Sequence, residues 1–299
     1  MLFVFAQLLG LLAALASAQS LDDTAASNIT CSPLELIIAR GTNEPPAPKY
    51  GIIVGDPLFD ATLALLPNIT GYAVNYPADL SCESRPDGVN DTLNHLYAQS
   101  RACPSQAYVL VGYSQGADVM HFAAAKISPY LYNRIYALVM FGDPGNRGPN
   151  ELSPQGGNTP PFPAALARKL KENCAPGDPL CNNNGTDVNA HLSYNDAGTT
   201  YISDSAKYIK KAYDAKGNQG PEPSPNGGTG EPTLAEEQAI QNLADLIGSG
   251  GTTCSTFPTV PASTATATGA PGSSFASGAA ITPAPVVGKR VVWRPQNGL

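Results

Sequence analysis

Ser114 is the residue in this chain best suited to nucleophilic chemistry. Residues 109–116 read Val-Leu-Val-Gly-Tyr-Ser-Gln-Gly, so an apolar run ends at Gly112 and a second glycine follows at Gly116. Gly-x-Ser-x-Gly is the pattern of a nucleophile elbow, a sharp turn from a strand into a helix that presents the serine hydroxyl at a sheet edge. The glycines are required there because the turn is strained and larger side chains would collide with neighbouring elements. An ordinary glycine-rich turn after a strand is the alternative.

A serine hydroxyl needs a general base, and the chain has three histidines. His95 precedes the serine on an expected helix, where a surface or packing role is favoured. His121 lies about two turns along the helix that follows Ser114, so its ring should point away from the hydroxyl. His191 lies in a loop ahead of the last helix of the domain, which suits the chain order serine, acid, histidine of α/β-hydrolases. We predict His191 as the base, although a loop histidine without a catalytic duty has the same sequence signature.

The acid that orients the base is chosen from four aspartates: Asp143, Asp178, Asp187 and Asp196. Asp143 follows an expected strand, where many α/β-hydrolases hold their acid, but Gly-Asp-Pro also forms turns that cap their own backbone. Asp178 lies between Cys174 and Cys181, in a short loop that a local disulfide would stiffen. A rigid mount helps a carboxylate hold an imidazole in one tautomer, so we favour Asp178.

Alternating apolar runs and amphipathic segments indicate the elements that position these residues. Strands are expected at 34–39, 72–74, 108–111 and 135–141, and helices at 87–102, with Asp87 as a cap, at 117–127 and at 199–215. Residues 164–173 are ambiguous between helix and strand, and 146–163 is expected to be a long surface loop near the site. The alternation predicts a layered α/β domain with a mainly parallel sheet.

The N-terminus and the charge suggest a secreted protein. Residues 1–18 are uncharged, leucine-rich and end in Ala-Ser-Ala, which predicts a secretory signal peptide cut after Ala18, although a basic n-region is missing. No later segment is long and apolar enough for a membrane span. The formal net charge of -7 argues against nucleic acid as a partner. We expect a secreted, extracellular monomer that neither crosses nor binds a membrane.

Secretion changes how the cysteines and the asparagines are interpreted. Six cysteines in an oxidising compartment predict three disulfides, and none has zinc-finger spacing, so neither a metal nor another cofactor is expected. Four sequons are N-glycosylation candidates and predict surface positions. They begin at Asn28, Asn68, Asn90 and Asn184.

Composition divides the chain into four parts. The signal peptide is followed by a catalytic domain at 19–215, then by 216–254, a glycine- and proline-rich linker with one more amphipathic helix at 233–247 that should dock on something. Residues 255–299 are rich in Ser, Thr, Pro and Ala, which predicts a disordered, O-glycosylated tail.

The combined motifs carry a specific resemblance. Gly-Tyr-Ser-Gln-Gly at 112–116, then Cys174-x-x-x-Asp178-x-x-Cys181, then His191 resembles the cutinase and acetylxylan esterase family of fungal secreted serine esterases, over about residues 31–215. The resemblance implies a three-layer α/β/α sandwich, the cutinase-like α/β-hydrolase fold with a small sheet. It also implies that Ser114 is the nucleophile, His191 the base and Asp178 its orienting acid.

The same resemblance implies an oxyanion hole and a set of disulfides. The oxyanion would be held by the backbone N–H of Gln115 and by Thr42, which follows Arg40-Gly41 after the first strand; a loop hydroxyl bonded to its own backbone is the alternative for Thr42. The implied disulfides are Cys31 with Cys103 and Cys174 with Cys181, which leaves Cys82 with Cys254 by subtraction.

The expected activity is serine carboxylic ester hydrolysis through an acyl-enzyme, without cofactor. The partner is an ester substrate, a plant cell-wall or cuticle polymer. The loops near the site mix apolar and polar residues and do not decide between substrates. We favour cutin or related aliphatic esters, with acetylated xylan as the alternative. The rival from another class is a non-catalytic glycosylated wall or surface protein on an esterase scaffold, which should show a broken triad.

Overall fold

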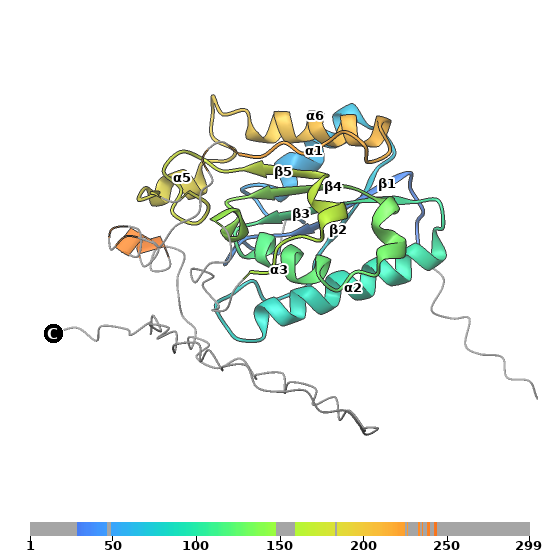
Figure 1. The fold of residues 1–299 in the computed structure, drawn as a ribbon, viewed down its shortest axis with the longest axis horizontal. Coiled ribbons are helices and arrows are strands. Elements are labelled where there is room, and N and C mark those ends of the chain that lie inside the picture. Colours follow the sequence, from blue (N-terminus) through green and yellow to red (C-terminus); the bar gives the residue numbers. More distant parts are fainter. Residues whose placement is uncertain are drawn as a thin grey trace, which may run out of the picture.

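The computed structural model describes residues 29–46, 49–147, 159–182 and 184–224, together with 226, 233, 235, 238, 239, 242 and 243. The expected signal peptide at 1–18 and tail at 255–299 lie outside these residues. A five-stranded sheet forms the centre, in the order β2-β1-β3-β4-β5, and every neighbouring pair is parallel (Figure 1). The strands are β1 (Leu34–Ala39), β2 (Thr70–Ala73), β3 (Ala107–Tyr113), β4 (Ile135–Phe141) and β5 (Leu170–Asn173).

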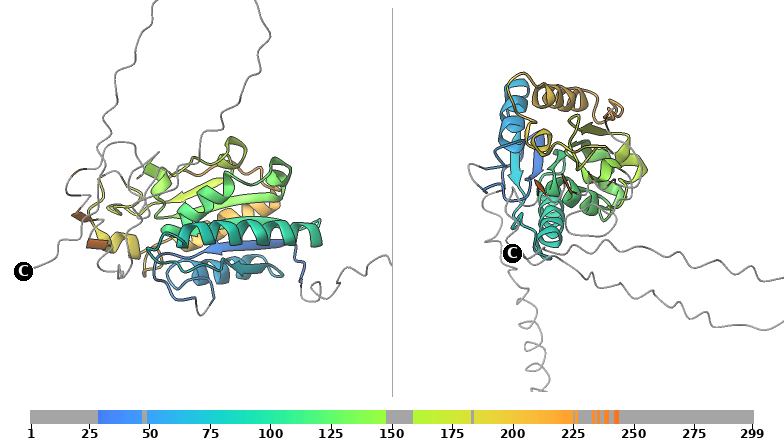
Figure 2. Two further views of the ribbon diagram at one scale, coloured as in Figure 1. Left: turned by 90° about the horizontal axis from the view of Figure 1, so that it is seen from below. Right: turned by 90° about the vertical axis from the view of Figure 1, so that its left-hand side faces the viewer.

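Helices cover both faces of this sheet. One face carries α1 (Gly55–Leu65) and α6 (Tyr201–Asp214), and the other carries α2 (Ser84–Ala102) and α3 (Gln115–Ala124), as Figures 1 and 2 show. Alternate strand residues supply the two cores, so Val109 and Val111 face one layer while Tyr108 and Leu110 face the other. Both faces of β3 are therefore buried, which explains its continuous apolar sequence. The predicted three-layer α/β/α sandwich is confirmed.

Several element boundaries differ from the prediction. Helix α2 begins at Ser84, so Asp87 lies in its first turn and is not the cap. The ambiguous residues 164–173 divide into α4 (Ala164–Ala167) and β5. Helix α1 was not predicted, because its first turn contains Gly55 and Pro57, two residues with low helix propensity. Proline is tolerated in a first helical turn, and a Cβ on Gly55 would lie 2.0 Å from the Tyr50 carbonyl oxygen.

Part of the expected linker packs onto the domain. Glu222 lies beside β5, where its N–H donates to the Leu170 carbonyl at 2.8 Å and its carbonyl accepts from Glu172 N–H at 2.9 Å. Backbone hydrogen bonds to the edge strand β5 thus order residue 222, although the glycine- and proline-rich composition of the segment predicted a linker. Farther on, Leu243 is 3 % exposed and clusters with Leu180, so the described part of the predicted C-terminal helix docks near the loop that carries Asp178.

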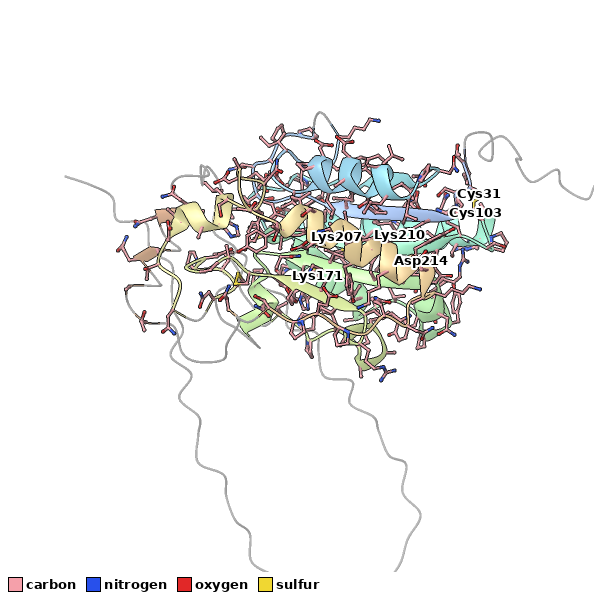
Figure 3. All side chains as sticks on the ribbon, turned by 90° about the horizontal axis from the view of Figure 1, so that it is seen from above. Cys31, Cys103, Lys171, Lys207, Lys210 and Asp214 are labelled. Atoms are coloured by element: carbon pink, nitrogen blue, oxygen red, sulfur yellow. A yellow bond between two sulfur atoms is a disulfide. The ribbon has the colours of Figure 1, made fainter. Side chains whose placement is uncertain are left out.

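The structure contains both disulfides that the resemblance implies. Cys31–Cys103 joins the segment before β1 to the end of α2, at the opposite end of the sheet from α5 (Val188–Leu192) (Figure 3). Cys174–Cys181 joins two cysteines seven positions apart and so closes a short loop that contains Asp178. Cys82 is also disulfide-bonded. Cys254 lies outside the described residues, so the pair Cys82–Cys254 stays a prediction.

Surface features agree with the sequence expectations where the structure describes them. Asn68, Asn90 and Asn184 are exposed, whereas Asn28 lies outside the described residues. Within the described ranges no helix has the length and apolar character to cross a membrane.

Candidate active site

Ser114 occupies the turn between β3 and α3. Its backbone has φ 54° and ψ -121°, a left-handed conformation that costs a non-glycine residue about 1–3 kcal/mol. A Cβ on Gly112 would lie 2.5 Å from the Cα of Ala117, and one on Gly116 would lie 2.0 Å from the carbonyl oxygen of Ala39. Strand, turn and helix are therefore packed too closely for any residue but glycine at positions 112 and 116, as the nucleophile-elbow prediction requires.

His191 and Asp178 form a buried pair at the same end of the sheet. His191 is 2 % exposed and lies on the short helix α5, not in an open loop as predicted, while Asp178 is fully buried. His191 Nδ1 lies 3.0 Å from Asp178 Oδ1 and 2.9 Å from Oδ2. Leu180 N–H donates to Oδ1 at 2.8 Å, so the disulfide-closed loop holds its own carboxylate. This contact orients the ring and leaves Nε2 for proton transfer.

His191 lies against the residues next to the serine turn. The ring of Tyr113, the residue before Ser114, stacks on the imidazole with centroids 5.1 Å apart, and its hydroxyl donates to the His191 carbonyl at 2.7 Å. Ser114 N–H donates to Phe141 carbonyl at 2.9 Å, and a Cβ on the next residue, Gly142, would lie 2.6 Å from His191 Cε1. The Ser114 hydroxyl makes no hydrogen bond to His191 here, and such bonds often tighten only when substrate binds.

Thr42 and Gln115 are the two residues predicted to supply the oxyanion donors. Thr42 is 8 % exposed, and its Oγ1 has no hydrogen-bond partner among the described residues, which excludes the alternative of a hydroxyl bonded to its own backbone there. Gln115 is the first residue of α3, so its backbone N–H has no acceptor within the helix. Its side chain is fixed, with Nε2 donating to Asp79 carbonyl at 2.6 Å and Oε1 accepting from Ser84 Oγ at 3.0 Å.

The loop that carries Thr42 is anchored by two charged residues for which the sequence analysis proposed no role. Glu44 accepts hydrogen bonds from the backbone N–H of Gly41 at 2.6 Å and of Ile53 at 2.8 Å. Burial raises the pKa of the Glu44 carboxyl in spite of these bonds. Arg40 Nε donates to the Glu44 carbonyl at 2.8 Å, and its Nη2 donates to the Tyr76 carbonyl at 2.7 Å. Both side chains therefore fix the position of the Thr42 backbone.

The remaining histidines are occupied elsewhere. His121 Nε2 lies 2.8 Å from Asp143 Oδ2, and its Nδ1 lies 2.8 Å from the Pro160 carbonyl. Asp143 thus serves a histidine on α3, which supports the choice of Asp178 over it. His95 is partly buried, contacts Glu35 at 3.0 Å and stacks on Tyr72, which is the expected packing role.

The other two acid candidates have structural roles. Asp187 caps α5 by accepting from Asn189 N–H at 2.9 Å. Asp196 is exposed, and its backbone carbonyl takes part in the turn before α6. Tyr194 was not singled out from the sequence, although it lies three residues after His191; only the fold shows that its hydroxyl reaches Asp178.

Comparison with known proteins gives a consistent family. The cutinase family model matches residues 30–213. Carboxylesterase Culp1 of Mycobacterium tuberculosis is 34 % identical over 173 residues, which cover 57 % of this chain and 77 % of Culp1.

Two solved structures extend the comparison. An iodinated complex of acetyl xylan esterase has a TM-score of 0.51 and 26 % identity over 62 % of this chain and 100 % of its own. Trichoderma reesei cutinase in complex with a phosphonate inhibitor has a TM-score of 0.50 and 28 % identity over 62 % of this chain and 78 % of its own. With its parallel sheet and strained serine turn, this chain belongs to the cutinase family and is a serine carboxylic ester hydrolase.

Proposed function

We propose that this protein hydrolyses carboxylic esters through an acyl-enzyme, with Ser114 as nucleophile, His191 as general base and Asp178 as the acid that orients it. The observation that carries the proposal is the strained Ser114 turn lying against a buried His191–Asp178 pair. His191 Nε2 accepts the Ser114 proton as Oγ attacks the ester carbonyl carbon, and it then protonates the leaving alcohol. Water repeats the sequence and releases the acid.

The oxyanion of each tetrahedral intermediate would be held by Thr42 Oγ1 and the Gln115 N–H. The unpartnered Thr42 hydroxyl supports this role, since a buried donor without an acceptor costs about 1–3 kcal/mol and is retained where a ligand completes it. The anchored Thr42 loop and the fixed Gln115 side chain keep both donors in place before substrate arrives, so that no reorganisation is needed during the reaction.

The proposed substrates are cutin or related aliphatic esters. Exposed Pro45 and Pro46 follow the Thr42 loop, and partly exposed Leu192 follows His191, which offers apolar surface to an aliphatic polyester. Two polar side chains, the exposed Asn43 and the partly exposed Ser193, lie close to them in the sequence. Removal of acetyl groups from xylan is the second candidate, and the match to the full length of acetyl xylan esterase favours it.

We further propose that the protein is secreted and acts outside the cell as a monomer on plant cell-wall or cuticle polymers. The uncharged leader at 1–18, the disulfides and the exposed sequons support secretion.

Replacement of Ser114 by Ala tests the proposal. Purified wild-type protein and S114A are assayed on p-nitrophenyl esters of increasing acyl length and on acetylated xylan. We expect S114A to lose at least about 1000-fold in kcat, since the nucleophile is gone. S203A, on the exposed side of α6, serves as a control and should keep full activity. S114A that hydrolyses esters at the parental rate would refute the role of Ser114, and a strict preference for acetyl esters would select the xylan substrate.

A further inference from the structure

We propose that Tyr194 is a positioning residue that holds the Asp178 carboxylate and limits the negative charge that this carboxylate presents to His191. The inference rests on the proposed function, because it gives Asp178 and His191 their catalytic roles. Tyr194 would not touch substrate; it would act through the carboxylate.

Tyr194 is fully buried, and its hydroxyl is committed to Asp178. The hydroxyl donates to Asp178 Oδ2 at 2.5 Å and accepts from Ala175 N–H at 3.2 Å. It also lies 3.5 Å from Cys181 Sγ. The single O–H donor is therefore directed at the carboxylate by a backbone group, and the hydroxyl bridges both ends of the disulfide-closed loop.

The two oxygens of the carboxylate are shared among three partners. Oδ1 accepts from Leu180 N–H, Oδ2 accepts from the Tyr194 hydroxyl, and His191 Nδ1 lies within 3.0 Å of both. A charged acceptor with fixed donors on each oxygen cannot rotate, and so the imidazole is held in one plane. Without Tyr194, the Leu180 N–H would be the one contact among the described residues, apart from His191 itself, that resists rotation.

The Tyr194 ring itself has a packing role that must be separated from that of the hydroxyl. It lies edge-on to Phe141 with centroids 5.7 Å apart, and it contacts Tyr201 at 5.2 Å and Tyr113 at 5.9 Å. Phenylalanine keeps these ring contacts and removes the hydroxyl, so that Asp178 loses a donor and Ala175 N–H loses its acceptor. The variant Tyr194→Phe therefore separates the role of the hydroxyl from that of the ring.

The other ionisable groups that face Asp178 stay neutral in the working range. They are Tyr113 on β3, Tyr194 itself and Tyr201 on α6, and burial together with the Asp178 charge raises the pKa of each hydroxyl. Cys174 and Cys181 do not titrate, because they form a disulfide with each other.

The sign of the effect follows from electrostatics. The hydroxyl points its positive end at Oδ2 and thereby weakens the negative potential at the imidazole. When it is removed, the carboxylate presents more negative charge to the imidazole, which favours the protonated ring that cannot act as a base. The freed carboxylate also orients the ring less firmly.

The test compares wild type, Y194F and Y208F. We expect Y194F to move the acid limb of the kcat/KM profile to higher pH and to lower kcat about tenfold, with KM unchanged. Tyr208 is a matched control, since it is a buried tyrosine whose hydroxyl donates to Gly220 carbonyl at 2.9 Å, and Y208F should keep the wild-type profile.

A second readout is the rate of phosphonate labelling at Ser114 at pH 6 and pH 8, counted by mass spectrometry. The ratio of the two rates reports only on folded molecules, so a partly unfolded Y194F still gives an answer. An acid limb and a labelling ratio equal to wild type would overturn the inference. Inactive wild type or active S114A would instead refute the proposed function.

Discussion

At the scale of single residues, the site depends on side chains and backbone held in costly states. Ser114 keeps a left-handed backbone, and Thr42 keeps a buried hydroxyl without a partner among the described residues. Each costs on the order of 1–3 kcal/mol, and the close packing around Gly112 and Gly116 holds the serine turn in place. Such costs are expected where a group must already be in its catalytic position.

Thr42→Val tests the oxyanion assignment. Valine keeps the shape of threonine and removes the hydroxyl, so we expect kcat to fall about 100-fold or more with little change in KM. Because an unpartnered buried donor is removed, the melting temperature should stay the same or rise. Thr42→Ser is the control and should retain most activity. If T42V keeps the kcat of wild type, the hydroxyl is not an oxyanion donor.

At the scale of elements, β4 and β5 end in a second cluster of ionisable groups. Asp143 is fully buried after β4, and its charge is stabilised by His121 and by Gly145 N–H at 2.7 Å, which lower its pKa in spite of burial. Glu172 on β5 lies beside it, and burial together with the Asp143 charge raises the pKa of Glu172 well above its ordinary value. Burial and mutual repulsion thus favour one charged carboxyl, Asp143, and one neutral carboxyl, Glu172.

Glu172→Gln tests this cluster through the pH dependence of stability. The pKa of Glu172 in the folded protein lies above its value in the unfolded chain. The stability that Glu172 contributes is therefore fully present below the unfolded pKa and is lost as pH rises through the folded pKa. His121 has the same sign, while Asp143, with a lowered pKa, contributes above its unfolded value and loses stability as pH falls. Glutamine is neutral throughout. We therefore expect the melting temperature of E172Q to fall less than that of wild type when the pH is raised from 5 to 9.

The control for this experiment is Glu222→Gln in the neighbouring segment. The Glu222 side chain is 41 % exposed and contacts Lys171 and Lys211, so its charge is screened by solvent. E222Q should melt with the pH dependence of wild type. An E172Q curve parallel to that of wild type would show that Glu172 is ionised in the folded protein.

At the scale of the whole molecule, the two described disulfides lie at different ends of one sheet and serve different purposes. Cys31–Cys103 spans 72 residues and ties the start of the sheet to α2, far from α5. Cys174–Cys181 spans seven residues and holds the loop of Asp178. The parallel sheet places all strand ends that carry chemistry at the second of these ends.

Removal of the two disulfides should separate stability from activity. C31S/C103S should lose about 4 kcal/mol in the chain-entropy model, or roughly 10 °C in melting temperature, and keep its kcat at 25 °C. C174S/C181S should lose less stability, because its loop is short, but should lose kcat, because Asp178 is no longer held. Equal loss of kcat in both variants would contradict this division.

The sequence by itself determined the local chemistry and most of the elements. The glycines around Ser114 predicted the strained turn, the apolar runs at 34–39 and 135–141 predicted β1 and β4 residue for residue, and elimination selected His191. These conclusions depend on short-range sterics and periodicity, which a sequence expresses directly. Helix α1 was missed because its first turn contains glycine and proline, and the glycine is needed there because the Tyr50 carbonyl lies close to Gly55.

Only the tertiary structure decided which groups meet. Asp143 and Asp178 both looked able to serve a histidine, and the fold gives Asp143 to His121 and Asp178 to His191. The roles of Glu44 and Tyr194, and the pairing of residue 222 with β5, also depend on contacts between segments distant in the chain or on how a loop closes. No local pattern encodes such contacts, because they arise from packing a whole sheet with its two layers of helices.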